Sequence, residues 1–314
     1  MTTAAPPVPA RPALTRRRID TWGLAFQGAL IFCLIACFAF LLVLLADVIG
    51  DGWVVFSDRG GEFLTSNLSS RPAQAGVWQA IKGSLMLAAF VVVISFPLGI
   101  ATAVYLEEYA RDTRLTRFIT LNIRNLAGVP SVVYGLLGLA VFVELLGNDR
   151  SGGGLTGGRT LLSGGLTLAL LVLPIVIITA SESIRAVPSS LREGGYGLGA
   201  TQSDVVRSLV LPNAAPGILT GTVLSLSRAL GETAPLILTG AVVSTFFATP
   251  NQSVADQIRG DYTALPVTIF TFARQAKPEF KNELAPAAIL VLLAVTLLCN
   301  AVAVLLRARY DTER

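Results

Sequence analysis

Long runs of residues without any charge recur along this chain, and each run is about as long as a membrane-spanning helix. The first, 22–46, is 25 residues long and contains no Asp, Glu, Lys or Arg. A bilayer core about 30 Å thick needs about 20 apolar residues in helical form. Only 14% of the chain is charged, against about 25% in soluble proteins. The sequence therefore predicts an all-α transmembrane protein.

Hydropathy predicts six spans and a short N-terminal extension. The extension, 1–18, is rich in Pro, Ala and Thr and is expected to be a disordered tail. The remaining residues, 19–314, form one membrane domain. Its predicted spans are 22–46, 82–105, 118–146, 161–182, 214–241 and 284–306. Three loops on one side of the membrane, at 47–81, 147–160 and 242–283, alternate with loops on the other side, including 183–213.

Basic residues predict the orientation, because cytoplasmic loops carry more Lys and Arg than external ones. The side that carries both termini has 13 basic residues and the opposite side has 9. Both termini and the 183–213 loop are therefore expected in the cytoplasm. The first run has no small-residue cleavage site, so it is expected to be a retained span.

Several classes of function are disfavoured by composition. The net charge of +4 does not indicate nucleic-acid binding, because the basic residues cluster at the ends of apolar runs. The chain has no histidine, which removes the commonest general base and metal ligand. Cys33, Cys37 and Cys299 lie in apolar runs and are expected to be small buried hydrophobes. The glycine-rich loop 147–160 lacks the lysine of a P-loop, so no ATPase, catalytic or metal site is predicted.

The loop between the fourth and fifth spans is longer than a simple turn requires. Pro188 is expected to end the preceding helix, and Ser190 with Glu193 matches a capping box that begins a new one. That helix is expected to end at Gly199, and a second to begin near Thr201. The second is expected to present one apolar face and to stop before the next span. Its apolar face comprises Val205, Val206 and Leu209, and its expected end is Pro212. On periodicity alone, the pair could equally lie flat at the membrane surface.

The spacing in this loop resembles that of ABC importer permeases, whose E-A-A-x-x-x-G-x(9)-I-x-L-P loop forms a coupling helix for the ATPase subunit. The positions that match or flank the motif are Ser190, Arg192, Glu193, Gly199, Leu209, Leu211 and Pro212. The resemblance implies that these residues dock the partner ATPase. Gly194 and Gly195 depart from the two alanines, and glycine weakens a helix interior by about 0.8–1 kcal/mol each.

Two charges lie near the middle of the fifth predicted span. Arg228 and Glu232 are four residues apart, so on a continuous helix they would share one face. A central charge costs about 2.5–3.5 kcal/mol on insertion scales. The pair could be a structural ion pair. Alternatively, it could line a water-accessible path in which Arg228 binds an oxyanion and Glu232 weakens its hold.

The third predicted span carries another candidate. Arg124 either reaches the cytoplasmic interface or faces the path. Glycines and Pro130 interrupt the following apolar helix, and such breaks commonly line cavities. Ser131 and Tyr134 could donate hydroxyl hydrogen bonds there, or make ordinary contacts between helices.

The segments "AGVPSVVYGLLGL", "LSRALGETAPLILTG" and "LPVTIF" together resemble the PstA family, one of two permease families of the bacterial phosphate-specific ABC importer. The similarity runs from about residue 80 to 310. It implies a six-helix type I importer permease of MetI-like fold in the bacterial plasma membrane, forming half of a phosphate path. The implied partners are the sister permease PstC, a dimer of the ATPase PstB, and the phosphate-binding protein PstS. ATP would be used by PstB, and no cofactor is expected on this chain.

Two other functions remain compatible with the sequence. The same architecture could import another oxyanion, such as phosphonate, sulfate or molybdate. A membrane protein that senses phosphate supply is the alternative of a different class.

Overall fold

The computed structural model describes residues 21–147, 154–241 and 258–312, and every regular element among them is a helix. The expected tail at 1–18 lies outside these residues. The chain divides into two units, 1–47 and 48–314. In the first, the described residues form the beginning of α1 (Thr21–Arg59), and side chains 22–47 are all exposed. This confirms a helix over the predicted first span.

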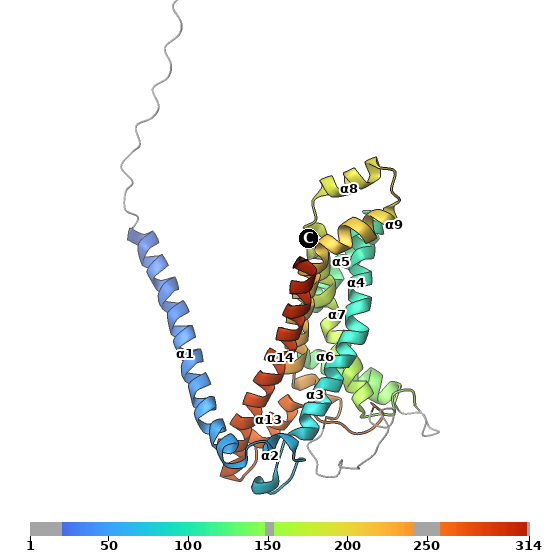
Figure 1. Ribbon diagram of the computed structural model, residues 1–314. Helices are drawn as coiled ribbons and strands as arrows, with labels where there is room; N and C mark the ends of the chain where they lie inside the picture. The colour runs from blue at the N-terminus through green and yellow to red at the C-terminus, as the bar shows by residue number, and fades with distance from the viewer. Residues whose placement is uncertain (1–20, 148–153, 242–257, 313–314) are drawn as a thin grey trace, which may run out of the picture. The chain divides into compact units, whose positions relative to one another are not determined.

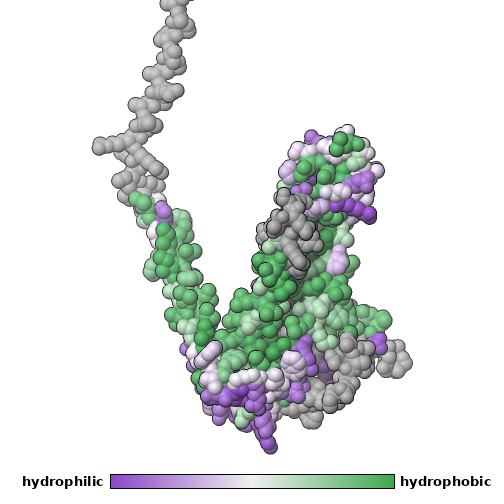
Figure 2. Space-filling view, in the orientation of Figure 1, coloured by the Kyte–Doolittle hydropathy of each residue, from purple (hydrophilic) through white to green (hydrophobic). Residues whose placement is uncertain are grey.

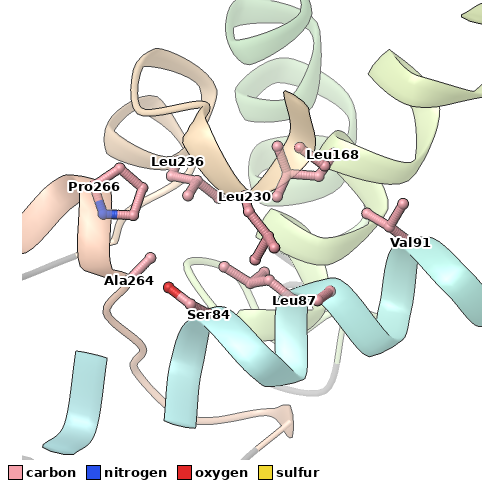
Figure 3. A pocket seen from close by; sticks show the side chains of 10 residues that line it. Ser84, Leu87, Val91, Leu168, Leu230, Leu236, Ala264 and Pro266 are labelled. Carbon is pink, nitrogen blue, oxygen red and sulfur yellow. The ribbon is translucent and has the colours of Figure 1, made fainter. Parts of the chain in front are cut away.

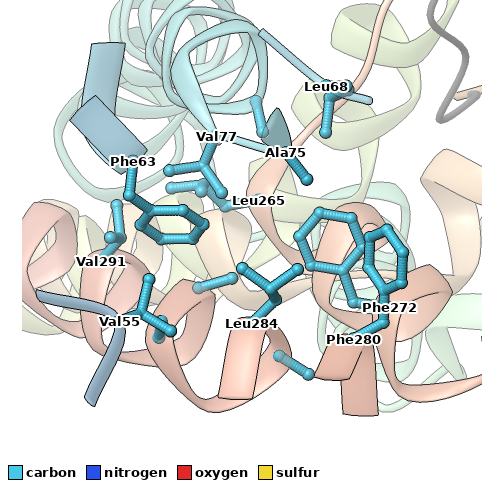
Figure 4. Packing of buried hydrophobic residues seen from close by; sticks show 14 residues of the cluster. Val55, Phe63, Leu68, Ala75, Val77, Leu265, Phe272, Phe280, Leu284 and Val291 are labelled. Atoms are coloured by element: carbon cyan, nitrogen blue, oxygen red, sulfur yellow. The ribbon is translucent and has the colours of Figure 1, made fainter. Parts of the chain in front are cut away.

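The segment expected as the first external loop is largely helical. Helix α1 continues to Arg59, and two short helices follow, α2 (Glu62–Thr65) and η1 (Pro72–Gln74). The second span then begins at Trp78 rather than at residue 82. Figure 4 shows how Phe63 of α2 packs with Phe272, Phe280 and Leu284 in one buried cluster. The segment 47–81, expected as a loop between spans, therefore contains helices whose apolar side chains, such as Phe63, are buried in this cluster.

The second span is a nearly continuous helix of 32 residues with two π-helical turns. It comprises α3 (Trp78–Phe90), η2 (Val91–Ser95), α4 (Phe96–Val104) and η3 (Tyr105–Tyr109). The fourth span, helix α7 (Leu161–Arg185), is the central helix of the fold. Two thirds of its most apolar stretch is buried, against one third for the second span. It contacts α4, α5, α6 and α10.

The third span is broken rather than straight. Helix α5 (Arg114–Ala127) and helix α6 (Ser131–Gly138), which continues as η4 (Leu139–Leu145), are bent by 102°. Pro130 has no amide hydrogen to continue the helix and disfavours helical geometry at the residue before it. The described residues therefore contain five helices able to cross a membrane, or six if the bent pair counts as one span.

The fifth span begins earlier and ends earlier than predicted. Helices α9 (Gln202–Val205), η5 (Val206–Val210) and α10 (Leu211–Gly231) run on as one 30-residue helix. Pro212 does not stop it, because the π-helical turn before the proline widens the backbone that its ring would otherwise strike. The helix ends at Gly231, since Pro235 cannot donate to the carbonyl of that residue. A short helix, α11 (Ala234–Leu238), follows.

The last part of the chain contains a short helix and a long one. Residues "LPVTIF" begin α13 (Leu265–Ala273), which has nine residues and is too short to span, as expected. The sixth span comprises η7 (Phe280–Leu284) and α14 (Ala285–Thr312).

Within residues 48–314, the two ends of the helix bundle are distinct. Helix α8 (Ser189–Gly197) and α9 lie at one end, close to the end of α14, and α2 and α13 lie at the other (Figure 1). Hydrophilic residues gather at these two ends, and hydrophobic residues cover the surface between them (Figure 2). The 183–213 loop and the C-terminal end of α14 therefore lie on the same side.

Candidate translocation and coupling sites

Arg228 and Glu232 form an ion pair at the end of α10. Arg228 Nε lies 3.4 Å from Glu232 Oε1. The two residues do not share one helix, as the sequence suggested, because Glu232 follows the last residue of α10 in an extended conformation. The arginine side chain is 51% exposed and the glutamate only 16%. Arg228 is thus the exposed member of the pair and Glu232 the shielded one.

A hydrogen bond between two helices fixes the level of Arg228. The neighbouring Ser227 Oγ donates to Asn300 Oδ1 on α14 at 2.5 Å. Asn300 lies 15 residues after the start of α14 and 12 before its end, which is about 22 Å and 18 Å along the axis. Arg228 therefore lies far from both ends of the sixth span, although its own helix ends three residues later.

One face of α10 is exposed along its whole length. Its exposed residues recur at spacings of three and four, which is the period of one helix face. They are Asn213, Gly217, Thr220, Leu224, Arg228 and Gly231. Except for Leu224 and Arg228, these side chains are small or polar. Arg228 is thus the only charged group on this face of α10.

The inner side of the helix break is tightly filled. Leu230 and Leu236, on either side of the break, enclose a void of about 10 Å³ with Ser84, Leu87 and Leu168 (Figure 3). This volume holds at most about one water molecule. This void has no room for an anion, whereas Arg228 is exposed on the outer face of α10.

The three candidate residues of the third span, Tyr134, Ser131 and Arg124, lie in different surroundings. Tyr134 is 6% exposed, and its hydroxyl donates to the carbonyl of Leu126 at 2.9 Å across the bend. This is the ordinary contact between helices that the sequence left open. Ser131 begins α6 and is half-buried. Arg124 is exposed in the last turn of α5 and lines a cavity of about 410 Å³ that contains neither Arg228 nor Glu232.

The coupling-loop helices differ in detail from the expectation. Helix α8 begins at Ser189 without a side-chain cap, so the capping box predicted at Ser190 and Glu193 is wrong. The capping box lies in the next helix, where Thr201 and Asp204 exchange hydrogen bonds. Both pairs fit the sequence pattern, and only the backbone distinguishes them. Gly199 adopts a φ of +81°, which explains a glycine at that position.

Several predicted docking residues lie on the outside of this loop. Ser190 and Glu193 are exposed on α8. Leu191, Tyr196 and Leu198 add apolar surface, and Leu198 is 92% exposed. Three further predicted positions are only partly exposed: Leu209 lies in η5, and Leu211 and Pro212 are the first residues of α10.

Arg192 faces inward. It donates from Nη1 to the carbonyl of Val187 at 2.7 Å and from Nη2 to that of Ile184 at 2.9 Å. Its Nη2 also lies 2.8 Å from Glu108 Oε1. Arg192 thus caps the end of α7 and ties α8 to the second span.

Sequence reasoning missed the two adjacent carboxylates at the end of the second span. Glu107 accepts two hydrogen bonds from Arg185, and Glu108 accepts two from Arg192. The sequence did contain a signal for these pairs. Two adjacent acids end the second span, and two arginines lie near the end of the fourth span, on the same predicted side of the membrane. A third pair, Asp112 and Arg117, is over 70% exposed on both sides. Its hydrogen bond from Arg117 holds the pKa of Asp112 below the ordinary value.

The sequence profile of one protein family covers the greater part of this fold. The family described as "Binding-protein-dependent transport system inner membrane component" matches residues 95–312, from the middle of the second span to the end of α14. The chain belongs to this family.

Individual relatives of this permease agree with the assignment. The chain is 34% identical to "Phosphate transport system permease protein PstA 1" of Mycobacterium tuberculosis H37Rv, over 96% of this chain and 92% of the relative. It is 34% identical to PstA of Yersinia pestis over 80% of the chain and 81% of the relative. PstC of Haemophilus influenzae is 32% identical over 77% and 84%. The predicted resemblance to the PstA family is confirmed.

Solved importer structures share the permease fold. An alginate ABC transporter matches with a TM-score of 0.61 at 17% identity, over 92% of this chain and 98% of that one. The inward-facing MetNI methionine transporter matches at 0.52 and 15%, over 75% and 94%. These likenesses confirm the predicted MetI-like, all-α architecture.

Proposed function

We propose that this permease forms half of a translocation path for inorganic phosphate, with Arg228 as an anion contact. The single observation that carries the proposal is the Arg228–Glu232 pair, in which a half-exposed guanidinium is paired with a shielded carboxylate. Among the described residues, no hydrogen bond engages the Nη groups of Arg228. A planar guanidinium with available donors suits the oxygens of phosphate. The names of the PstA relatives point to the same anion.

Glu232 would help the bound phosphate to dissociate from Arg228. When the path is empty, the carboxylate neutralises Arg228 at 3.4 Å. When phosphate arrives, the same carboxylate limits how tightly the anion is held, and a path conducts only if its ligand can leave. Arg124 and Ser131 are further candidates, on the elements around the bend of the third span. For Tyr134 the hydrogen bond to Leu126 favours a structural role instead.

The proposed assembly follows the family pattern. This chain would pair with PstC, receive phosphate outside from PstS, and be driven by a PstB dimer that hydrolyses ATP. No cofactor is assigned to this chain. The outer surface of α8, with Glu193 and Leu198, suits docking of the ATPase because it combines charge with exposed apolar area. On this proposal the α8 end and both termini lie in the cytoplasm, as the distribution of basic residues predicts.

The test is phosphate uptake by cells that carry Arg228→Gln together with the normal partner subunits. We expect uptake to fall by about 100-fold, since removing one hydrogen-bond donor to an oxyanion costs about 2.7–4 kcal/mol in enzyme sites. The matched control is Arg117→Gln, which removes an exposed guanidinium already paired with Asp112. Co-purification of all subunits checks assembly. Normal uptake by an assembled Arg228→Gln complex would refute the anion contact, and loss of assembly would indicate a structural ion pair.

Competition in the same assay tests the identity of the anion. Excess unlabelled phosphate should suppress the uptake of radioactive phosphate, whereas sulfate, molybdate and phosphonate should not. Suppression by one of these at lower concentration than phosphate would identify that oxyanion as the substrate.

A further inference from the structure

We infer that Glu108 is a positioning residue that joins the coupling loop rigidly to the second span, so that movement of the loop is delivered to that span. This inference rests on the proposed docking of an ATPase at α8. Glu108 lies apart from the exposed residues of α8 proposed to dock the ATPase, such as Glu193, and apart from the candidate anion site. It acts through Arg192 and Gln202.

Glu108 holds both halves of the loop at once. Its carboxylate Oε1 accepts from Arg192 Nη2 at 2.8 Å and from Nε at 3.1 Å, on α8. Its backbone carbonyl accepts from the side chain of Gln202, the first residue of α9. The residue pairs are 84 and 94 positions apart in the chain. One residue of the second span therefore contacts the helices on either side of the loop's turn.

Arg192 completes the joint. It bonds the carbonyls of Ile184 and Val187 at the end of α7 while it holds Glu108. Helix ends leave such carbonyls without partners in the helix itself. Three elements, the second span, α7 and α8, thus meet at one guanidinium.

Burial distinguishes this pair from the neighbouring ones. The side chains of Glu108 and Arg192 are 6% and 21% exposed, whereas Arg185 beside Glu107 is 59% exposed. Exposed ion pairs contribute little, but a shielded, multiply hydrogen-bonded one resists separation. Beneath the pair, Ala103 of the second span packs with Ile184, Val187 and Val205 in one buried cluster. The loop and the second span are therefore joined both by apolar packing and by a shielded ion pair. Two such contacts limit movement of the loop relative to the span.

The test measures phosphate transported per ATP hydrolysed by the purified complex in proteoliposomes. In Glu108→Gln the side-chain shape is kept and the charge removed, which halves the strength of charge-assisted hydrogen bonds. We expect the transport-to-ATP ratio to fall about fivefold, and about tenfold or more in Glu108→Ala, as for loss of an ordinary coupling contact. ATPase should still co-purify. Asp112→Asn, which removes an exposed carboxylate paired with arginine, should leave the ratio unchanged.

The outcomes separate this inference from the proposed function. An unchanged ratio in Glu108→Gln with the ATPase bound would overturn the inference, and so would an equal fall in Asp112→Asn. If Glu108→Ala fails to assemble, the Gln variant decides. Glu193→Lys, on the exposed side of α8, tests docking separately. If it leaves ATPase co-purification and uptake normal, the proposed docking surface is wrong whatever Glu108 does.

Discussion

The hydroxyl of Tyr134 donates to the carbonyl of Leu126 at 2.9 Å, and so links the two helices on either side of the 102° bend. Leu126 lies in the last turn of α5, where carbonyls lose their partners in the helix. The carbonyl of Leu126 still accepts from the amide of Val129 at 3.0 Å, and Tyr134 adds a second donor from the next helix. The break in the third span is therefore a stabilised feature of the fold.

Replacing this tyrosine tests its role. In Tyr134→Phe the carbonyl of Leu126 loses one of its two donors, and we expect the free energy of unfolding to fall by about 0.5–1.5 kcal/mol. Thermal unfolding of the purified complex would show this as a lower Tm. The KM for phosphate should not change. Tyr105→Phe, at a side chain that is 61% exposed, is the control and should alter neither quantity. A changed KM at unaltered Tm would instead assign Tyr134 to the anion path.

Glu232→Gln should affect transport in a particular way. Without the carboxylate, Arg228 holds the anion more tightly and releases it more slowly. We expect KM and the maximal uptake rate each to fall by about 3- to 10-fold, which corresponds to roughly 0.7–1.4 kcal/mol. Uptake measured over a range of phosphate concentrations separates the two quantities. The control is Glu144→Gln, which removes an exposed carboxylate from η4. A raised KM in Glu232→Gln would contradict the release role.

Two adjacent glycines of α8, Gly194 and Gly195, should respond oppositely to alanine. A β-carbon at Gly195 would lie 2.8 Å from Val205 Cγ2 and 2.9 Å from Leu209 Cδ1, whereas one at Gly194 would meet nothing within 4 Å. We expect Gly195→Ala to destabilise the packing of α8 by about 1–3 kcal/mol through overpacking. Gly194→Ala should stabilise it by about 0.8–1 kcal/mol. Hydrogen exchange of α8 amides would measure both. Equal effects at the two positions would show that α8 does not pack as described.

Hydropathy was sufficient for the number and the approximate positions of the spans, because burial in lipid imposes one long apolar run for each crossing. It could not place the ends at Gly231 or the bend at Pro130, since apolar composition continues through both. The motif spacing located α8, and Gly199 was a correct end signal because its φ of +81° favours glycine.

The contacts that define the sites were beyond sequence reasoning for a different reason. The Glu108–Arg192 pair joins residues 84 positions apart, and no local pattern encodes such a distance. Ser227 and Asn300 are 73 positions apart, and their hydrogen bond marks the level of Arg228 along the sixth span. The charges themselves were visible in the sequence, but their partners depend on how the helices pack.

The π-helical turn at Val206–Val210 has a consequence for changes in chain length. Such a turn is equivalent to an α-helix that has taken in one extra residue. Deleting one residue there would convert the turn to α-helix and leave α10 facing as before. The same deletion between Asn213 and Leu224 would rotate everything after it by about 100°. Arg228 would then turn away from the exposed face, so η5 is where this span can lose a residue and keep its charge in place.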